Sequence, residues 1–85
     1  MSETAANRIK RLKMRSMRRG IKEMDIILSA YADAQLEGMS DEKIMLYDAL
    51  LDENDQDLYS WVTGQTTPPE QFDALLTEIG QTFQK

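Results

Sequence analysis

The most constraining feature of this chain is a recurrence of apolar residues at spacings of three and four along nearly all of its 85 residues. The stripe formed by Ile21, Met24, Leu28 and Tyr31 is one example, and such spacing places side chains on one face of an α-helix. No window shows the sustained period-two alternation of a half-buried strand, and β-branched residues are sparse. The pattern therefore predicts an all-α fold: a small bundle of five short helices in a single domain, residues 1–85.

Helix-start and helix-stop residues divide the chain into these five segments. We expect helices over about residues 4–17, 21–36, 41–52, 55–63 and 68–83. Ser40 and Asn54 are good N-caps for the third and fourth helices, and Thr67 followed by Pro68 has the pattern of a capped start for the fifth. The first helix carries few apolar residues, so we expect it to be the least well anchored helix and its first turns to fray. We expect the last few residues of the chain to fray as well. The expected helix stops are single glycines, Gly38 and Gly64.

Charge is divided unevenly along the chain. Residues 1–22 hold eight of the ten Lys and Arg residues and one acid, which gives a net charge of +7, whereas residues 23–85 carry −12. A compact domain with so divided a charge usually has a face meant for another molecule. The basic segment is expected to meet either an acidic protein partner or the acidic body of its own chain.

Composition argues against several classes of function. Without cysteine or histidine, the chain lacks disulfides, thiolate metal sites and the commonest general base, and we expect neither a catalytic nor a metal-binding residue. No apolar run is long enough to cross a membrane, and we expect no insertion into one. The basic start is similar to a mitochondrial presequence, but it continues into a motif whose removal would cut the fold. A nucleic-acid interface is disfavoured by the acidic remainder, the sequence pI near 4.6 and the lack of an aromatic residue in the basic run.

Some residues have a structural interpretation as well as a functional one. The methionines at positions 14, 24 and 45 are expected to fill gaps in a small core rather than line a binding groove. Trp61 is expected in the core, with a role as an apolar anchor for a partner as the alternative. The acidic cluster over residues 52–57 is interpreted as a helix cap and a solvated face.

The stretch Arg18-Arg19-Gly20-Ile21-Lys22-Glu23-Met24-Asp25 lies where the basic segment becomes acidic. In a structural interpretation, Gly20 supplies a backbone angle that other residues resist, and Glu23 reaches back from the third position of the helix to the Gly20 amide. That interpretation does not account for Arg18, Arg19 and Lys22, although cations would also be favourable at the C-terminal end of the first helix. Exposed at a helix corner, the guanidinium groups of Arg18 and Arg19 would suit carboxylates on a partner.

This stretch resembles the motif Arg-Arg-Gly-x-x-Glu-x-Asp of the succinate dehydrogenase flavinylation factors, a family of small mitochondrial and bacterial assembly proteins. A second match runs from Leu50-Leu51-Asp52 through Asp55-Gln56-Asp57-Leu58-Tyr59-Ser60-Trp61, and the resemblance covers about residues 8–64. Two departures are small: Gln56 stands where many members have Pro, and Met24 where many have Leu.

The resemblance implies a five-helix chaperone, not an enzyme. Its partner would be the flavoprotein subunit of succinate dehydrogenase, with the fumarate reductase flavoprotein as a second client, and it would promote covalent FAD attachment without holding a cofactor stably. A bacterial member would be cytoplasmic and a eukaryotic one would lie in the mitochondrial matrix. The alternatives are an antitoxin-like interaction module and a nucleic-acid binder using the basic first helix. The residues we expect at the partner interface are Arg18, Arg19, Gly20, Glu23, Asp25, Tyr59 and Trp61.

Overall fold

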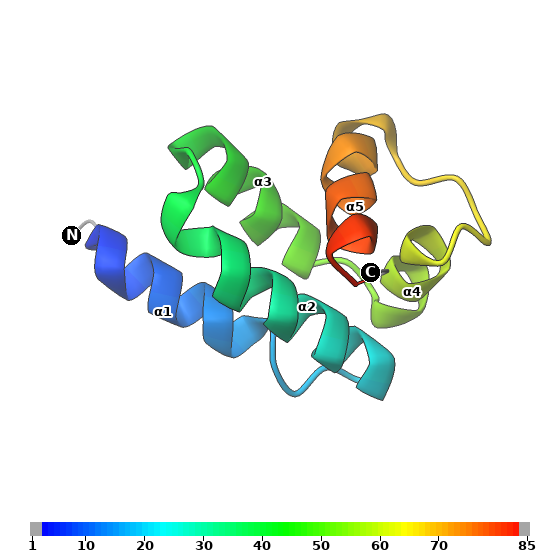
Figure 1. Cartoon of the computed structure of the whole chain (residues 1–85), viewed down its shortest axis with the longest axis horizontal. Helices are drawn as coiled ribbons and strands as arrows, with labels where there is room; N and C mark the ends of the chain where they lie inside the picture. The colour runs from blue at the N-terminus through cyan, green and yellow to red at the C-terminus, as the bar shows by residue number, and fades with distance from the viewer. Residues whose placement is uncertain (1–2, 84–85) are drawn as a thin grey trace.

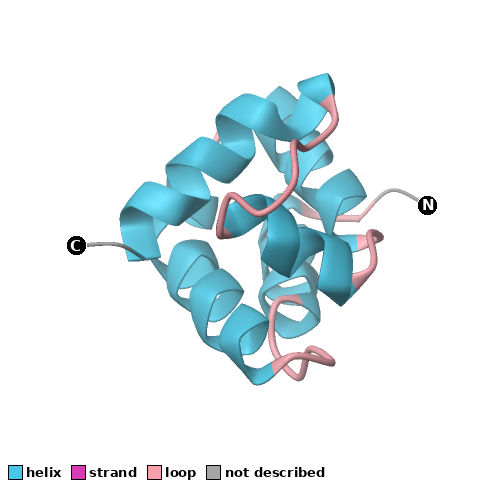
Figure 2. Ribbon diagram, turned by 90° about the vertical axis from the view of Figure 1, so that its right-hand side faces the viewer, coloured by secondary structure: helices cyan, strands magenta, loops and turns pink. Residues whose placement is uncertain are grey.

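The computed structural model describes residues 3–83, and within this range it contains helices and loops but no strand (Figure 2). The predicted all-α fold of five short helices is confirmed, with one added 3₁₀ turn, η1, after the second helix. The elements in chain order are α1 (Ala5–Arg15), α2 (Lys22–Gln35), η1 (Leu36–Gly38), α3 (Asp41–Leu51), α4 (Asp55–Val62) and α5 (Glu70–Phe83).

Helix α2 is the central element of the bundle. The chain runs along α1, reverses through a short loop, and returns along α2 beside it (Figure 1). Helices α4 and α5 also pack against α2, and α5 touches α3. The reversal between α1 and α2 therefore lies close to the end of the molecule that carries α4.

The core is apolar and continuous through all five helices. Tyr31 and Tyr47 are fully buried in it, with ring centroids 5.5 Å apart. Ser16 is the buried polar residue of the described chain, and its hydroxyl lies 2.7 Å from the Tyr47 hydroxyl and donates to the Leu12 carbonyl at 2.8 Å. Burial raises the pKa of Tyr47 to about 12, so this phenol stays neutral and links α1 to α3 by a hydrogen bond.

The methionine prediction is right for one residue and wrong for two. Met24 is fully buried, but Met14 is 65% exposed and Met45 is 66% exposed. The core-facing positions on α1 belong to Leu12, which is fully buried, and to Ile9, which packs partly buried against the core; Met14 lies on another face of the helix.

Helix ends follow the predicted caps at two of three places. The Ser40 hydroxyl accepts from the Lys43 amide at 3.2 Å, and the side-chain Oδ1 of Asn54 accepts from the Gln56 amide at 2.7 Å. The predicted start of the last helix at Pro68 is wrong, because α5 begins at Glu70. A residue that precedes a proline is disfavoured in the helical region of backbone angles. Thr67 precedes Pro68, and Pro68 precedes Pro69, so neither residue is suited to the first turn of a helix.

Gly64 ends α4 as predicted, with a φ of +82° that other residues adopt at a cost.

Candidate functional site: the corner between α1 and α2

The loop over residues 16–21, which we call the α1–α2 corner, turns the chain back on itself through a left-handed residue. That residue is Arg18, with φ 58°. Its amide donates to the Asp25 carboxylate at 2.8 Å, and Asp25 also accepts from the Ser29 hydroxyl at 3.2 Å. The prediction that Gly20 supplies the unusual backbone angle is wrong, since the strained position lies two residues earlier and is held by Asp25.

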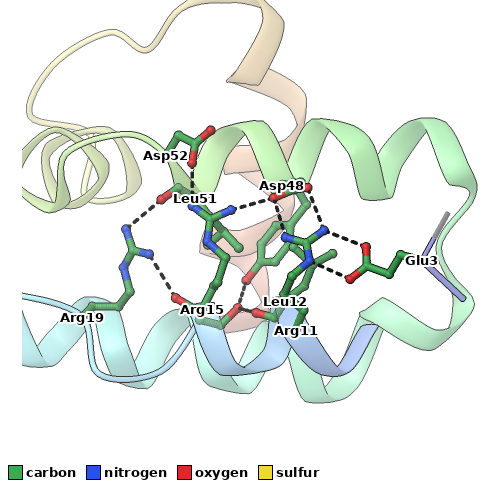
Figure 3. Close-up of polar contacts among 10 residues, drawn as sticks. Glu3, Arg11, Leu12, Arg15, Arg19, Asp48, Leu51 and Asp52 are labelled. Carbon is green, nitrogen blue, oxygen red and sulfur yellow. Dashed lines mark hydrogen bonds and ion pairs between the residues drawn. The ribbon is translucent and has the colours of Figure 1, made fainter. Parts of the chain in front are cut away.

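Arg19 points into the protein, so the prediction that it is offered outward is wrong. Its side chain is 11% exposed. The guanidinium donates to Asp55 at 2.7 Å, to the Arg15 carbonyl at 3.0 Å and to the Leu51 carbonyl at 3.3 Å. Figure 3 shows it bridging the end of α1 and the end of α3. A planar guanidinium suits this arrangement because its five donors are fixed in different directions.

Gly20 lies against the same carboxylate. Its amide donates to Asp55 Oδ2 at 2.6 Å, and a Cβ built on Gly20 would meet that oxygen at 3.0 Å. The absence of a side chain thus has a reason inside the protein: Asp55 approaches the backbone closely. The amide is already satisfied, so the prediction that Glu23 reaches back to cap it is wrong.

The side chains of Arg18, Lys22 and Glu23 are exposed. In the part of the chain that the structure describes, they form no ion pair or side-chain hydrogen bond. Glu23 occupies the second position of α2, where its charge is favourable beside the positive end of the helix. The corner and the first turn of α2 therefore present two cations and one anion to solvent, and the carboxylates of Asp25 and Asp55 hold the backbone of the corner in place.

Most cations of α1 are paired with acids of the same chain. Arg15 bridges Asp48 and Asp52, each at 2.6 Å, and Arg11 lies 2.8 Å from Glu3 and 3.1 Å from Asp48 (Figure 3). The interpretation that the basic segment docks on its own acidic body is confirmed for this helix. Further pairs join α1 to the rest of the chain through Arg8 with Asp41, and Lys13 with Asp33 and Glu37.

Tyr59 and Trp61 on α4 are partly buried against the core. The Trp61 ring lies 6.4 Å from that of Phe72. Trp61 also lines an open groove of about 530 Å³ formed by α4, the following loop and α5, and that lining includes no residue of the α1–α2 corner. Trp61 thus packs against the core with one part of its side chain and faces solvent with another. Its position is compatible with both interpretations made from the sequence, a core residue and an apolar anchor for a partner.

Sequence reasoning missed Asp55 as a residue of this site. It was interpreted as part of an acidic cap, although it lies in the second family motif. The available signal was its position as the first residue of α4, directly after the α3–α4 junction, where a carboxylate can contact another part of the chain as well as cap the helix. The structure joins the two motifs through it.

Residues 3–83 contain no group of three or more acidic side chains placed to hold a metal ion. None of the helices described in them is both long and apolar enough to cross a membrane. What the fold and the corner define is a small five-helix protein that carries a charged, rigidly held loop between its first two helices.

Comparison with known proteins narrows this class to a family. The family described as "Flavinator of succinate dehydrogenase" matches residues 10–83, and the chain belongs to it. Curated relatives are named "Succinate dehydrogenase assembly factor 2, mitochondrial". The relative in Penicillium rubens is 43% identical over 70 residues, 82% of this chain and 22% of that protein. The relative in Aspergillus flavus is 48% identical over 60 residues, 71% of this chain and 20% of that protein.

An insect protein, "Succinate dehydrogenase assembly factor 2-B, mitochondrial" of Drosophila mojavensis, is 34% identical over 79 residues. The match spans 91% of this chain and 50% of that protein. The chain thus spans about a fifth to a half of the length of the curated relatives it matches.

Proposed function

We propose that this protein binds the flavoprotein subunit of succinate dehydrogenase and promotes covalent attachment of FAD to it. One observation carries the proposal: the chain belongs to a family named for this task, and the stretch that resembles the family's charged motif forms the corner between α1 and α2 and the first turn of α2, where Arg18 and Glu23 are exposed. The names of the relatives refer to succinate dehydrogenase assembly, which supports the choice of client.

The protein acts as a positioning partner in this proposal and not as the catalyst. Covalent flavinylation proceeds within the flavoprotein once FAD and its attachment residue are held together, which is an effect of proximity and orientation. A partner that binds the competent conformation more tightly raises its population. The factor needs no stably bound cofactor for this task.

The residues of the corner and of the first turn of α2 divide into two roles. Arg18 contacts a carboxylate of the flavoprotein through charge-assisted hydrogen bonds, and Glu23 contacts a cation. Arg19, Gly20 and Asp25 hold the loop in shape, since their polar groups are already used inside the chain. Tyr59 and Trp61 remain predicted apolar anchors at the interface.

Other functions have less support. A nucleic-acid interface on α1 would need free cations, but Arg8, Arg11, Lys13 and Arg15 are paired with acids. The antitoxin role and the fumarate reductase client remain predictions without a structural observation in their favour. The relatives are named as mitochondrial, so we propose that the protein works wherever the flavoprotein acquires FAD, which is the mitochondrial matrix for a eukaryotic source.

Co-expression tests the proposal. The flavoprotein is produced in cells that lack their own factor, with or without this protein, and covalent flavin is read by in-gel fluorescence. We expect the protein to raise the fluorescence and to co-purify with the flavoprotein. Arg18→Ala should weaken both effects, while Gln71→Ala, an exposed change on α5, should weaken neither. Equal covalent flavin with and without the protein would show that the proposed function is wrong.

A further inference from the structure

An exposed stripe of side chains runs from helix α1 into the first residues of the α1–α2 corner. Lys10 and Met14 are four residues apart on one face of α1, and Met17 follows in the α1–α2 corner, where its amide donates to the Met14 carbonyl at 3.1 Å. Met14 is 65% exposed and Met17 is 49% exposed. Large apolar side chains that stay this exposed next to one another are typical of a contact surface.

The stripe ends at the α1–α2 corner. Met14, Met17 and Arg18 together line a small hollow of about 120 Å³, and all three residues are exposed. Methionine suits such a surface because its unbranched, polarizable side chain adapts to the shape of a partner. The hollow is large enough for part of one apolar side chain.

Charge indicates the kind of partner. Among the basic residues that the structure describes, six form ion pairs with acids of the chain, and the three that do not are Lys10, Arg18 and Lys22. Two of these three stand at opposite ends of the methionine pair. On a chain of net charge −5, this is a local site of uncompensated positive charge, and a complementary surface carries carboxylates.

We propose that Lys10, Met14, Met17 and Arg18 form a docking stripe for an acidic segment of the flavoprotein. The segment places one apolar side chain against the two methionines, and carboxylates on either side of it meet Lys10 and Arg18. The inference rests on the proposed function and extends the interface from the corner along α1. The flavoprotein is favoured over a second copy of this chain because Arg18 belongs to both the stripe and the corner.

Two methionines of equal exposure provide a matched test. Met14→Glu places a negative charge in the stripe, and Met45→Glu makes the same change on α3 at a side chain that is 66% exposed. Binding of each purified full-length variant to the flavoprotein subunit is measured by titration calorimetry at low and high salt. We expect Met14→Glu to weaken binding about tenfold or more, and Met45→Glu to leave it within about twofold.

A second pair of variants keeps the test informative if Met14→Glu unfolds. Met14→Gln and Met17→Gln remove apolar surface without adding charge, and thermal melting followed by circular dichroism checks that they fold. Lys10→Gln should weaken binding at low salt and have a smaller effect at high salt, because the contact is electrostatic.

The outcomes separate the stripe from the proposed function. If the native chain binds the flavoprotein and the folded Met14 variants bind equally well, the stripe is wrong and the proposed function stands. If the native chain does not bind the flavoprotein, the proposed function fails and the stripe fails with it. If sedimentation shows a dimer that Met14→Glu dissociates, with flavoprotein binding unchanged, the occupant is a second copy and the inference is overturned.

Discussion

The guanidinium of Arg19 and the carboxylate of Asp55 form an ion pair across 36 positions of sequence, with Nε 2.7 Å from Oδ1. The other carboxylate oxygen accepts from the Gly20 amide at 2.6 Å. Because Asp55 is the first residue of α4, this pair fixes the corner between α1 and α2 to the junction between α3 and α4. Two motifs that are separate in the sequence are therefore one structural unit.

Asp55→Asn should destabilise the fold. The substitution removes a charge from a pair whose side chains are 11% and 20% exposed, and the cation left behind loses its compensation. We expect the free energy of unfolding to fall by about 2–3 kcal/mol, measured by urea denaturation. Asp57→Asn is the control, because Asp57 is exposed in the same helical turn and should cost less than about 1 kcal/mol. Equal losses for both variants would contradict the role given to Asp55.

Arg19→Lys and Arg18→Lys should differ in what they affect. A lysine at position 19 keeps the charge but cannot reach Asp55 and two backbone carbonyls at once, so stability should fall by about 1–3 kcal/mol. Position 18 makes no such contacts with its side chain, and Arg18→Lys should change stability by less than about 0.5 kcal/mol. Chemical denaturation of both variants gives the comparison. A greater loss of stability in Arg18→Lys would reverse the assignment of inner and outer arginine.

Arg18→Gly should stabilise the protein while weakening its function. Glycine adopts the φ of 58° found at this position without the steric cost that a side chain has there, and the amide bond to Asp25 is kept. We expect the free energy of unfolding to rise by roughly 0.5 kcal/mol, together with a loss of covalent flavin in the co-expression assay. Arg18→Ala should lose function equally but gain no stability. Full activity in both variants would show that the Arg18 side chain is not a partner contact.

Glu78 should make the free energy of unfolding depend on pH in the acidic range. Hydrogen bonds from Lys43 and then Tyr31 hold the pKa of Glu78 below its ordinary value of 4.5. The folded state therefore binds the proton less readily than the unfolded chain, so the stabilisation is complete above about pH 4.5 and declines as the pH falls below it. Glu78→Gln should lower the melting temperature at neutral pH, and the difference from the native chain should narrow below pH 4.5. A difference that is constant with pH would contradict the ionic contribution.

Local patterns in the sequence were enough to predict the elements of the fold. The spacing of apolar residues placed all five helices, and Ser40, Asn54 and Gly64 ended or began them where predicted. These features depend on contacts between residues a few positions apart, and side-chain and backbone preferences determine such contacts directly. The misplaced start of α5 also has a local cause, because Pro69 disfavours a helical conformation at Pro68.

The sequence by itself also determined the charge division and the two motifs that identify the family. The tertiary structure decided which cations are paired inside the molecule, because an ion pair such as Arg19 with Asp55 depends on how the α1–α2 corner and the start of α4 meet in space. The same packing placed Leu12 inside and left Met14 in solvent. Helical spacing shows that residues share a face, but only the packing of the other helices decides which face is buried.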